Sequence, residues 1–283
     1  MELNIVHTTR YNYSKAVSLL PHYIRLKPQS RSYLTLSKFD ISISPEPMSI
    51  SERIDAENNP YFQVWMQPVP LKELEIKAQI NLQLETFDPF HFIIDPPVRF
   101  FQSKFHYPDT HKEYLKPFLP TKVCSKNFTS FLSERIKGSD RSCILFITDL
   151  LRYIANNFEY IRKERDVTLE SENTFNKLSG SCKELSWMLI EMLRCTGLAA
   201  RFVSGYAYNP ILGDGHELHA WVEVLLPGAG WIGLDPSSGL LTDEHYIPVA
   251  TSFNPELTMP VTGAFAGDAK SKLNASVTII EVD

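Results

Sequence analysis

The sequence is poor in cysteine, and its few cysteines form no recognisable pattern. The 283 residues include four, at positions 124, 143, 182 and 195, with no CxxC pair among them. This spacing excludes a zinc finger and the dense disulfide framework of small secreted domains. We therefore expect reduced thiols in a protein of the cytoplasm, where disulfides are rare.

We also expect no leader and no membrane-spanning segment, and the composition shows no excess of positive charge. Residues 1–7 show no basic segment followed by an apolar one, and no stretch approaches the ~20 apolar residues that cross a bilayer. With 28 Lys and Arg against 33 Asp and Glu, the net charge is −5. Such a chain is a poor non-specific ligand for nucleic acid. We expect neither membrane nor nucleic acid as a partner, and the oligomeric state stays open.

Short runs of β-branched and aromatic residues dominate the first 85 residues. Breaks rich in proline or asparagine separate the runs, and residues 74–84 alternate apolar with polar side chains throughout. A period of two predicts a strand with one buried and one wet face. We expect an antiparallel sandwich with strands over residues 3–13, 17–26, 36–43, 48–54, 61–66 and 74–84.

The remainder divides into a linker and a second region. Residues 86–122 are rich in proline and aromatic residues, which predicts a linker that packs on its neighbours. The apolar period then becomes that of helices, followed by further strands. We expect helices over 128–136, 144–158 and 182–195, and strands over 201–208, 219–226, 231–234 and 277–282. The sequence thus predicts a β-rich domain over 1–85 and an α+β core over 123–283.

Cys182 lies just after a Gly-Ser turn, in the first turn of the third expected helix. Unpaired backbone N–H groups and the positive end of the helix dipole both stabilise a thiolate there, and the thiolate is the nucleophilic form of cysteine. Ser179 or Ser181 could cap the helix, and Glu184 suits its first turn. The alternative is a buried cysteine that packs as a small hydrophobe.

His219 opens a strand in which His219, Trp221 and Glu223 share one face. An imidazole beside a thiolate can act as its base and hold it as an ion pair. His216 and His219 also have the spacing of metal ligands, but two histidines without a third ligand are a weak zinc signal. We interpret His216 as a surface residue. Because no acidic calcium-binding loop is visible either, we expect no metal and no cofactor.

Asp235 ends the next expected strand, just before Pro236. A hairpin that turns within residues 227–230 would bring this carboxylate back toward His219, where it could fix the imidazole tautomer. A simple two-residue turn would instead place Asp235 opposite Val222, on the wrong face. The hypothesis therefore requires a bulge or an asymmetric loop. The alternative is an aspartate that only starts a turn.

Together these segments resemble the transglutaminase-like superfamily. The matching text is GSCKE at 180–184, RFVSGY at 201–206, HAWVEV at 219–224 and GWIGLDP at 230–236. The likeness spans roughly residues 125–250, and the β-rich first part resembles the N-terminal region of bacterial members. It implies a papain-like core in which the cysteine helix packs on an antiparallel sheet. It also implies Cys182 as nucleophile, His219 as general base and then acid, and Asp235 as the orienting carboxylate.

The sequence departs from the bacterial pattern at two places. Lys183 and Glu184 follow the cysteine where Arg or Gln and then Asp are common, and residues 237–239 read SSG in place of TNG. These changes concern substrate binding rather than the three implied catalytic residues. The implied reaction is acyl transfer through a thioester on a peptide or protein amide, with hydrolysis favoured. Amine transfer by a protein-glutamine transglutaminase, and a binding module with a vestigial site, remain the alternatives.

Overall fold

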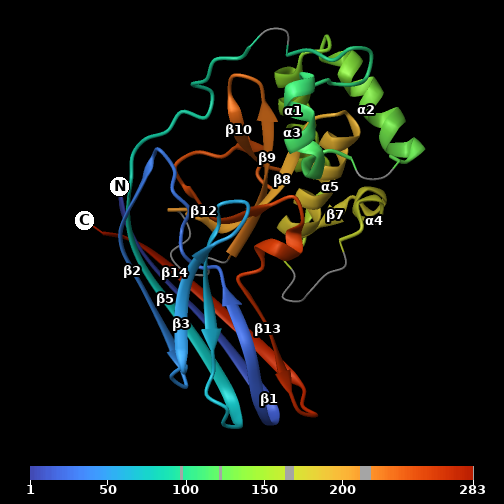
Figure 1. The fold of residues 1–283 in the computed structure, drawn as a ribbon. Helices are drawn as coiled ribbons and strands as arrows, with labels where there is room; N and C mark the ends of the chain where they lie inside the picture. Colours follow the sequence, from blue (N-terminus) through green and yellow to red (C-terminus); the bar gives the residue numbers. More distant parts are fainter. Residues whose placement is uncertain (96–97, 121–122, 163–168, 211–217, 283) are drawn as a thin grey trace.

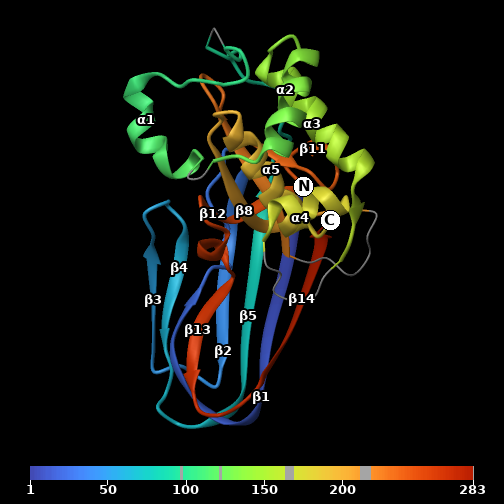
Figure 2. The ribbon, with the colours of Figure 1, turned by 90° about the vertical axis from the view of Figure 1, so that its right-hand side faces the viewer.

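The molecule has a part made of long strands and a part that contains the helices, at opposite ends in Figures 1 and 2. The computed structural model describes residues 1–283 except 96–97, 121–122, 163–168, 211–217 and 283. Both ends of the chain lie together, because Glu2 pairs with Val282. Among the described residues, no helix combines the length and the apolar character that a bilayer crossing needs.

The part with long strands is antiparallel and is organised around β1. Its strands are β1 (Glu2–Ile24), β2 (Leu34–Ser44), β3 (Ser49–Ile54), β4 (Pro60–Trp65), β5 (Leu71–Leu84), β13 (Val261–Ala266) and β14 (Ser271–Val282). The first half of β1 pairs with β5 and β14, and its second half pairs with β4 and β13. The antiparallel arrangement is confirmed, although the strands expected over 3–13 and 17–26 are one continuous strand.

The alternation in β5 has the expected consequence for burial. Every second residue from Leu74 to Leu84 is buried, as a strand with one apolar face requires. Leu74 and Ile76 pack in a cluster with residues of β1 and β4. Ile80 and Leu82 pack in a second cluster that also contains residues of the other part of the molecule. One strand face therefore joins the two parts.

The second part holds all the helices of the described residues and a five-stranded sheet. The helices are α1 (Asp109–Leu115), α2 (Lys126–Gly138), α3 (Cys143–Asn157), α4 (Ser171–Lys177) and α5 (Cys182–Cys195), with 3₁₀ turns η1 (Lys116–Phe118) and η2 (Pro255–Thr258). The sheet order is β11-β10-β9-β8-β12, from β8 (Ala200–Ala207), β9 (Leu218–Leu226), β10 (Gly230–Asp235), β11 (Leu240–Leu241) and β12 (Tyr246–Ser252). A short parallel pair joins β6 (Glu159–Tyr160) to β7 (Ser179–Gly180).

The expected cysteine helix on an antiparallel sheet is confirmed. Helix α5 spans Cys182–Cys195, and its buried residues pack with residues of β8 and β9. The sequence does not predict α1 or α4, because each has only seven residues and cannot show a helical apolar period. It also does not predict β12, which proves important for the site.

The expected core boundary at residue 283 is wrong. Residues 261–282 form β13 and β14, which pair with β1 and so belong to the sheets of the first part. Residues 277–282 form a strand, as expected, but its partner is the opposite end of the chain. Periodicity predicts that a segment is a strand, whereas the choice of partner depends on the tertiary fold.

The described residues of the stretch 86–122 pack closely on the second part. Phe100, Phe105, Tyr107 and Leu115 are buried in the same cluster as residues of α2, α3 and α5. The Phe105 N–H donates to the Thr196 carbonyl at 2.7 Å, just beyond α5. This stretch also contains α1, whose Leu115 is buried in that cluster.

The expectation of four reduced thiols is wrong. Cys124, beside the start of α2, forms a disulfide with Cys195 at the end of α5, across 71 residues of sequence. Cys143 and Cys182 are free. A single pair at this separation gives no sequence pattern, because only the fold brings its two cysteines together. The cytoplasmic location stays a prediction.

Candidate active site

The start of α5 is fixed by a capping box. The Ser181 hydroxyl oxygen accepts the Glu184 N–H, and the Glu184 carboxylate accepts the Ser181 N–H at 2.9 Å. Reciprocal bonds of this kind hold the first helical turn in one conformation. Cys182 is therefore the first residue of the helix, where its backbone N–H has no intrahelical acceptor.

An odd-length loop solves the register problem of the β9–β10 hairpin. Leu226 pairs with Gly230 and Val222 with Leu234, so the connection has three residues, 227–229. Gly228 and Gly230 have positive φ angles of 84° and 76°, which glycine adopts without strain. The register places Asp235 level with Trp221, on the same face of the sheet as His219. The expected need for an asymmetric connection is met in this way.

The structure brings Cys182, His219 and Asp235 together. The Nε2 atom of His219 lies 2.9 Å from Oδ2 of Asp235. Cys182 lies close enough to the His219 side chain and to the Ala220 backbone for both to lower the pKa of its thiol. Ser186 of α5 donates to the Ala220 carbonyl at 3.1 Å, which ties the helix to β9 at this level. All three residues implied by the resemblance thus lie in one connected group.

The three groups stabilise one another's charges against the cost of burial. Burial lowers the pKa of His219, but the charge and hydrogen bond of Asp235 raise it, to about 10 overall. Burial raises the pKa of Asp235, whereas His219, Ser237 and Tyr246 lower it, to about 2 overall. Burial also raises the pKa of the Cys182 thiol, but the hydrogen bond and charge of His219 bring this pKa below its ordinary value. The site therefore favours a thiolate beside an imidazolium.

Two residues that donate hydrogen bonds to the Asp235 carboxylate are not predicted from the sequence. Ser237 donates its backbone N–H and its hydroxyl to Oδ1, at 2.9 and 2.6 Å. The Tyr246 hydroxyl donates to Oδ2 at 2.8 Å. The Asp-Pro-Ser text could have revealed Ser237, because aspartate commonly accepts a bond from the backbone two residues on. Nothing in the sequence connects Tyr246 to Asp235, since Tyr246 lies on a strand that is not adjacent to β10 in the sheet.

The residues that share the His219 face are buried and fixed. The Trp221 ring stacks on His219, with ring centres 6.3 Å apart, and Gly205 leaves space for it, since a Cβ there would lie 2.6 Å from the Trp221 ring. Glu223 is paired with Arg201 of β8 at 2.6 Å and with Arg31 of the first part at 3.0 Å. Burial raises the pKa of Glu223, but the two guanidinium groups lower it below its ordinary value.

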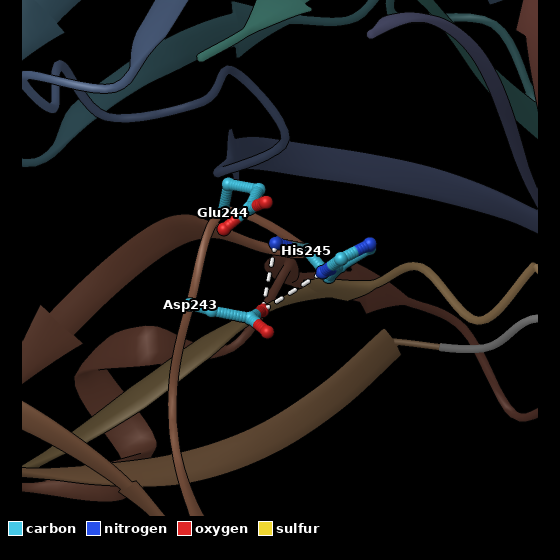
Figure 3. A group of neighbouring side chains, drawn as sticks. All are labelled: Asp243, Glu244 and His245. Carbon is cyan, nitrogen blue, oxygen red and sulfur yellow. Dashed lines mark hydrogen bonds and ion pairs between the residues drawn. The ribbon is translucent and has the colours of Figure 1, made fainter. Parts of the chain in front are cut away.

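Asp243, Glu244 and His245 form a group of potential metal ligands near this site, shown in Figure 3. One ligand atom from each lies within 4.8 Å of the others. Protein donors already occupy two of these side chains: Asp243 Oδ1 accepts the His245 N–H at 3.0 Å, and Glu244 accepts the Phe87 N–H at 3.2 Å. We assign no metal to this group. His216, the other histidine considered from the sequence, lies outside the described residues.

Comparisons with family models match both parts of the chain. Residues 3–83 match the bacterial transglutaminase-like N-terminal region, and residues 131–236 match the transglutaminase-like superfamily. The second match contains Cys182, His219 and Asp235. These matches confirm the resemblance drawn from the sequence.

Individual proteins also match parts of the chain. An uncharacterised protein of Mycobacterium tuberculosis is 28% identical over 151 residues, and the match spans 48% of that protein and 50% of this chain. The chain thus spans about half the length of this relative. A protein-glutamine gamma-glutamyltransferase of Pseudomonas aeruginosa is 36% identical over 70 residues, which are 22% of this chain and 10% of that protein.

A solved structure shares the fold over the whole chain. The crystal structure of a candidate cysteine protease from Cytophaga hutchinsonii superposes with a TM-score of 0.70 at 15% identity. The match covers 100% of this chain and 92% of that one. The two parts of this chain, in the arrangement described above, therefore also occur together in another protein.

Proposed function

We propose that this chain, which carries a transglutaminase-like core, is an enzyme of thiol-dependent acyl transfer, and that it hydrolyses a peptide or protein amide. The observation that carries the proposal is the Cys182 thiol at the tip of α5, in contact with a histidine bonded to a buried carboxylate. In this role Cys182 is the nucleophile, His219 the general base and acid, and Asp235 the group that orients His219.

The reaction would proceed in two halves. The Cys182 thiolate attacks the amide carbonyl carbon, the C–N bond breaks, and the His219 imidazolium gives its proton to the leaving amine. A thioester remains on Cys182. His219, now neutral, removes a proton from water, the hydroxide adds to the thioester carbonyl, and the C–S bond breaks. The acid leaves and the thiolate–imidazolium pair is restored.

The helix tip can also stabilise the charge that develops on the carbonyl oxygen. The Cys182 N–H has no intrahelical acceptor, and the positive end of the α5 dipole lies at the same point. Backbone N–H groups directed at a developing oxyanion lower the barrier of acyl transfer. The same backbone position therefore supports both the nucleophile and the oxyanion.

A second candidate differs only in the acceptor. If a primary amine resolves the thioester in place of water, the reaction is that of a protein-glutamine transglutaminase. The 36% identity over 70 residues to the Pseudomonas aeruginosa gamma-glutamyltransferase favours this candidate. The similarity of the whole fold to a candidate cysteine protease favours hydrolysis, at 15% identity.

The nucleophile can be tested by alkylation with iodoacetamide, with the adduct located by mass spectrometry. We expect rapid labelling of Cys182 at neutral pH and none of Cys143, which is a matched internal control because both thiols are free. A Cys182→Ala variant should abolish both the labelling and the activity. Labelling of Cys182 as slow as that of Cys143 would refute the proposal.

The acceptor can be identified by supplying both possibilities at once. Casein is incubated with the protein and with dansylcadaverine, a fluorescent primary amine. New amino termini without dansyl incorporation would support hydrolysis, and dansyl attached to casein glutamine would support amine transfer. In each case the Cys182→Ala variant should give neither product.

A further inference from the structure

Tyr246 connects Asp235 to the first part of the molecule. It is the first residue of β12, the edge strand of the five-stranded sheet. Its hydroxyl donates to Oδ2 of Asp235 at 2.8 Å, and this is the oxygen that also contacts His219. Its backbone carbonyl accepts the Tyr33 hydroxyl at 2.8 Å. One residue thus contacts the charged pair through its side chain and the β-rich part through its backbone.

Further bonds from the first part hold the free edge of β12. The Gln29 N–H donates to the Pro248 carbonyl at 2.8 Å. The Asn59 side chain accepts the Thr251 N–H at 2.8 Å and donates to the Thr251 carbonyl at 2.9 Å. On its other side, β12 pairs with β8. Gln29 and Asn59 therefore supply hydrogen bonds to the edge of β12 that a neighbouring strand would otherwise supply.

We propose that Tyr246 is a positioning residue for the Asp235–His219 pair, and that Tyr33 fixes Tyr246, so that the first part of the chain completes the site. The proposal rests on the proposed function, because it concerns the same three residues. It gives the β-rich part a definite role in the chemistry of the second part, exerted along the bonds Tyr33 to Tyr246 to Asp235.

The packing of the two tyrosine rings supports this role. The Tyr246 ring packs edge-on against Trp221, with centres 5.3 Å apart at 75°, so the hydroxyl has little freedom to leave Asp235. The Tyr33 ring packs on Phe87, with centres 4.9 Å apart. Both hydroxyls are thus held at the end of a fixed ring. Such pre-organised partners keep a reacting group in its productive orientation.

Loss of the Tyr246 hydroxyl should misdirect the carboxylate. Asp235 is 2% exposed, and its other oxygen is already held by Ser237. Without the tyrosine donor, His219 is the one partner that Oδ2 keeps among the described residues, so the carboxylate can rotate away from the orientation in which it faces the imidazole. The imidazolium of His219 would then be less stabilised, and so would the Cys182 thiolate that depends on it.

The test measures the rate of iodoacetamide alkylation at Cys182 against pH in four full-length proteins: the wild type, Tyr246→Phe, Tyr33→Phe and the double variant. We expect the rate at pH 7 to fall about 5-fold for Tyr246→Phe and about 2-fold for Tyr33→Phe, the range of a single hydrogen bond. Both variants should move the midpoint of the profile to higher pH. The double variant should be no slower than Tyr246→Phe alone, because Tyr33 acts through Tyr246.

Tyr61→Phe is the matched control, since the Tyr61 ring contacts Tyr23 and Arg25, neither of which belongs to the site described above. Its profile should superimpose on that of the wild type. Thermal unfolding of each variant shows whether it is folded at the temperature of the assay. A structural role alone would change the unfolding midpoint and leave the pH profile of the folded protein in place.

The outcomes separate the two proposals. A wild-type profile with a low midpoint and an unchanged Tyr246→Phe profile would overturn the positioning role and leave the proposed function standing. Additive effects of the two variants would overturn the part assigned to Tyr33. A wild-type profile typical of an ordinary thiol would refute the proposed function, and the positioning role with it.

Discussion

Two helices of this protein are each capped by a serine and begin with a cysteine, yet the pKa values of the two thiols are shifted in opposite directions. Helix α3 begins at Cys143 with Ser142 as its cap, and α5 begins at Cys182 with Ser181 as its cap. In both cases the serine hydroxyl accepts the N–H three residues on. Each thiol therefore lies at the same place relative to its serine cap and to the positive end of its helix dipole, although only α5 has a full capping box.

The surroundings of the two thiols are opposite. Cys143 is completely buried in the apolar cluster of the second part, and burial raises its pKa to about 12. Its backbone N–H points to the Val98 carbonyl at 3.4 Å, so the preceding stretch covers the helix tip. Cys182 is partly exposed and touches His219, and its pKa is lowered.

This difference shows that a helix N-terminus does not by itself make a cysteine reactive. The dipole contributes on the order of 0.3–1 kcal/mol at most exposed sites, which burial in an apolar core readily exceeds. The charged partner of the thiol determines whether the cysteine is reactive. For Cys182 this partner is His219, which lies on β9, a strand that begins 36 residues after Cys182. The predictions below test this comparison.

The largest loss of activity is expected when the His219 imidazole, the charged partner of Cys182, is removed. In His219→Ala, Cys182 keeps its helix tip but loses its imidazole, so its pKa should rise above the ordinary value because burial remains. Activity should fall by about 10²- to 10⁴-fold, the usual contribution of a general acid–base. The alkylation profile of Cys182 should then approach that of Cys143. A variant that retains fast alkylation at neutral pH would show that the helix tip is sufficient after all.

The pH dependence of the wild type should separate the two thiols without mutation. The thiolate–imidazolium pair exists above the lowered pKa of Cys182 and below the pKa of His219, about 10. Activity should therefore fall about tenfold per pH unit on the acid side, below the lowered pKa of Cys182, and again on the alkaline side, above about pH 10. Cys143 should react only near pH 12 or after unfolding. Both are measured by initial rates and by mass spectrometry of the alkylated protein.

The smallest effects should come from the two caps. Ser142→Ala and Ser181→Ala should each lower the free energy of unfolding by about 1 kcal/mol, the usual loss of an N-cap hydrogen bond. Chemical denaturation measures both. Only Ser181→Ala should also slow the alkylation of Cys182, by about 2- to 5-fold, because its first turn carries the thiol. Equal slowing by Ser142→Ala would mean that general stability, not the local turn, controls the reactivity.

Much of the fold is predictable where local periodicity is strong. The bounds of α5 are those expected from its apolar stripe and from Gly197 at its end. The strand over 74–84 has the alternating burial that its sequence predicts. Prediction fails for the return of residues 261–282 to β1 and for the Cys124–Cys195 disulfide, because each contact joins segments far apart in the sequence.

The candidate site follows the same division. The resemblance identifies Cys182, His219 and Asp235, and the structure places them in contact. Register arguments show that a two-residue turn cannot place Asp235 correctly, but they do not choose the three-residue loop that does. The role of Tyr246 cannot be predicted from the sequence, because its hydrogen bond to Asp235 depends on how β12 lies against the rest of the sheet.

The sequence by itself determined where helices and strands form and which helix tips carry a capped cysteine, because both properties depend on residues a few positions apart. Tertiary structure decided which of the two capped cysteines meets a charged histidine and which is buried. A pKa depends on solvent exposure and on nearby charges, and both come from segments that only folding brings together. The same reason makes Tyr33, in the β-rich part, a neighbour of the residue that holds Asp235.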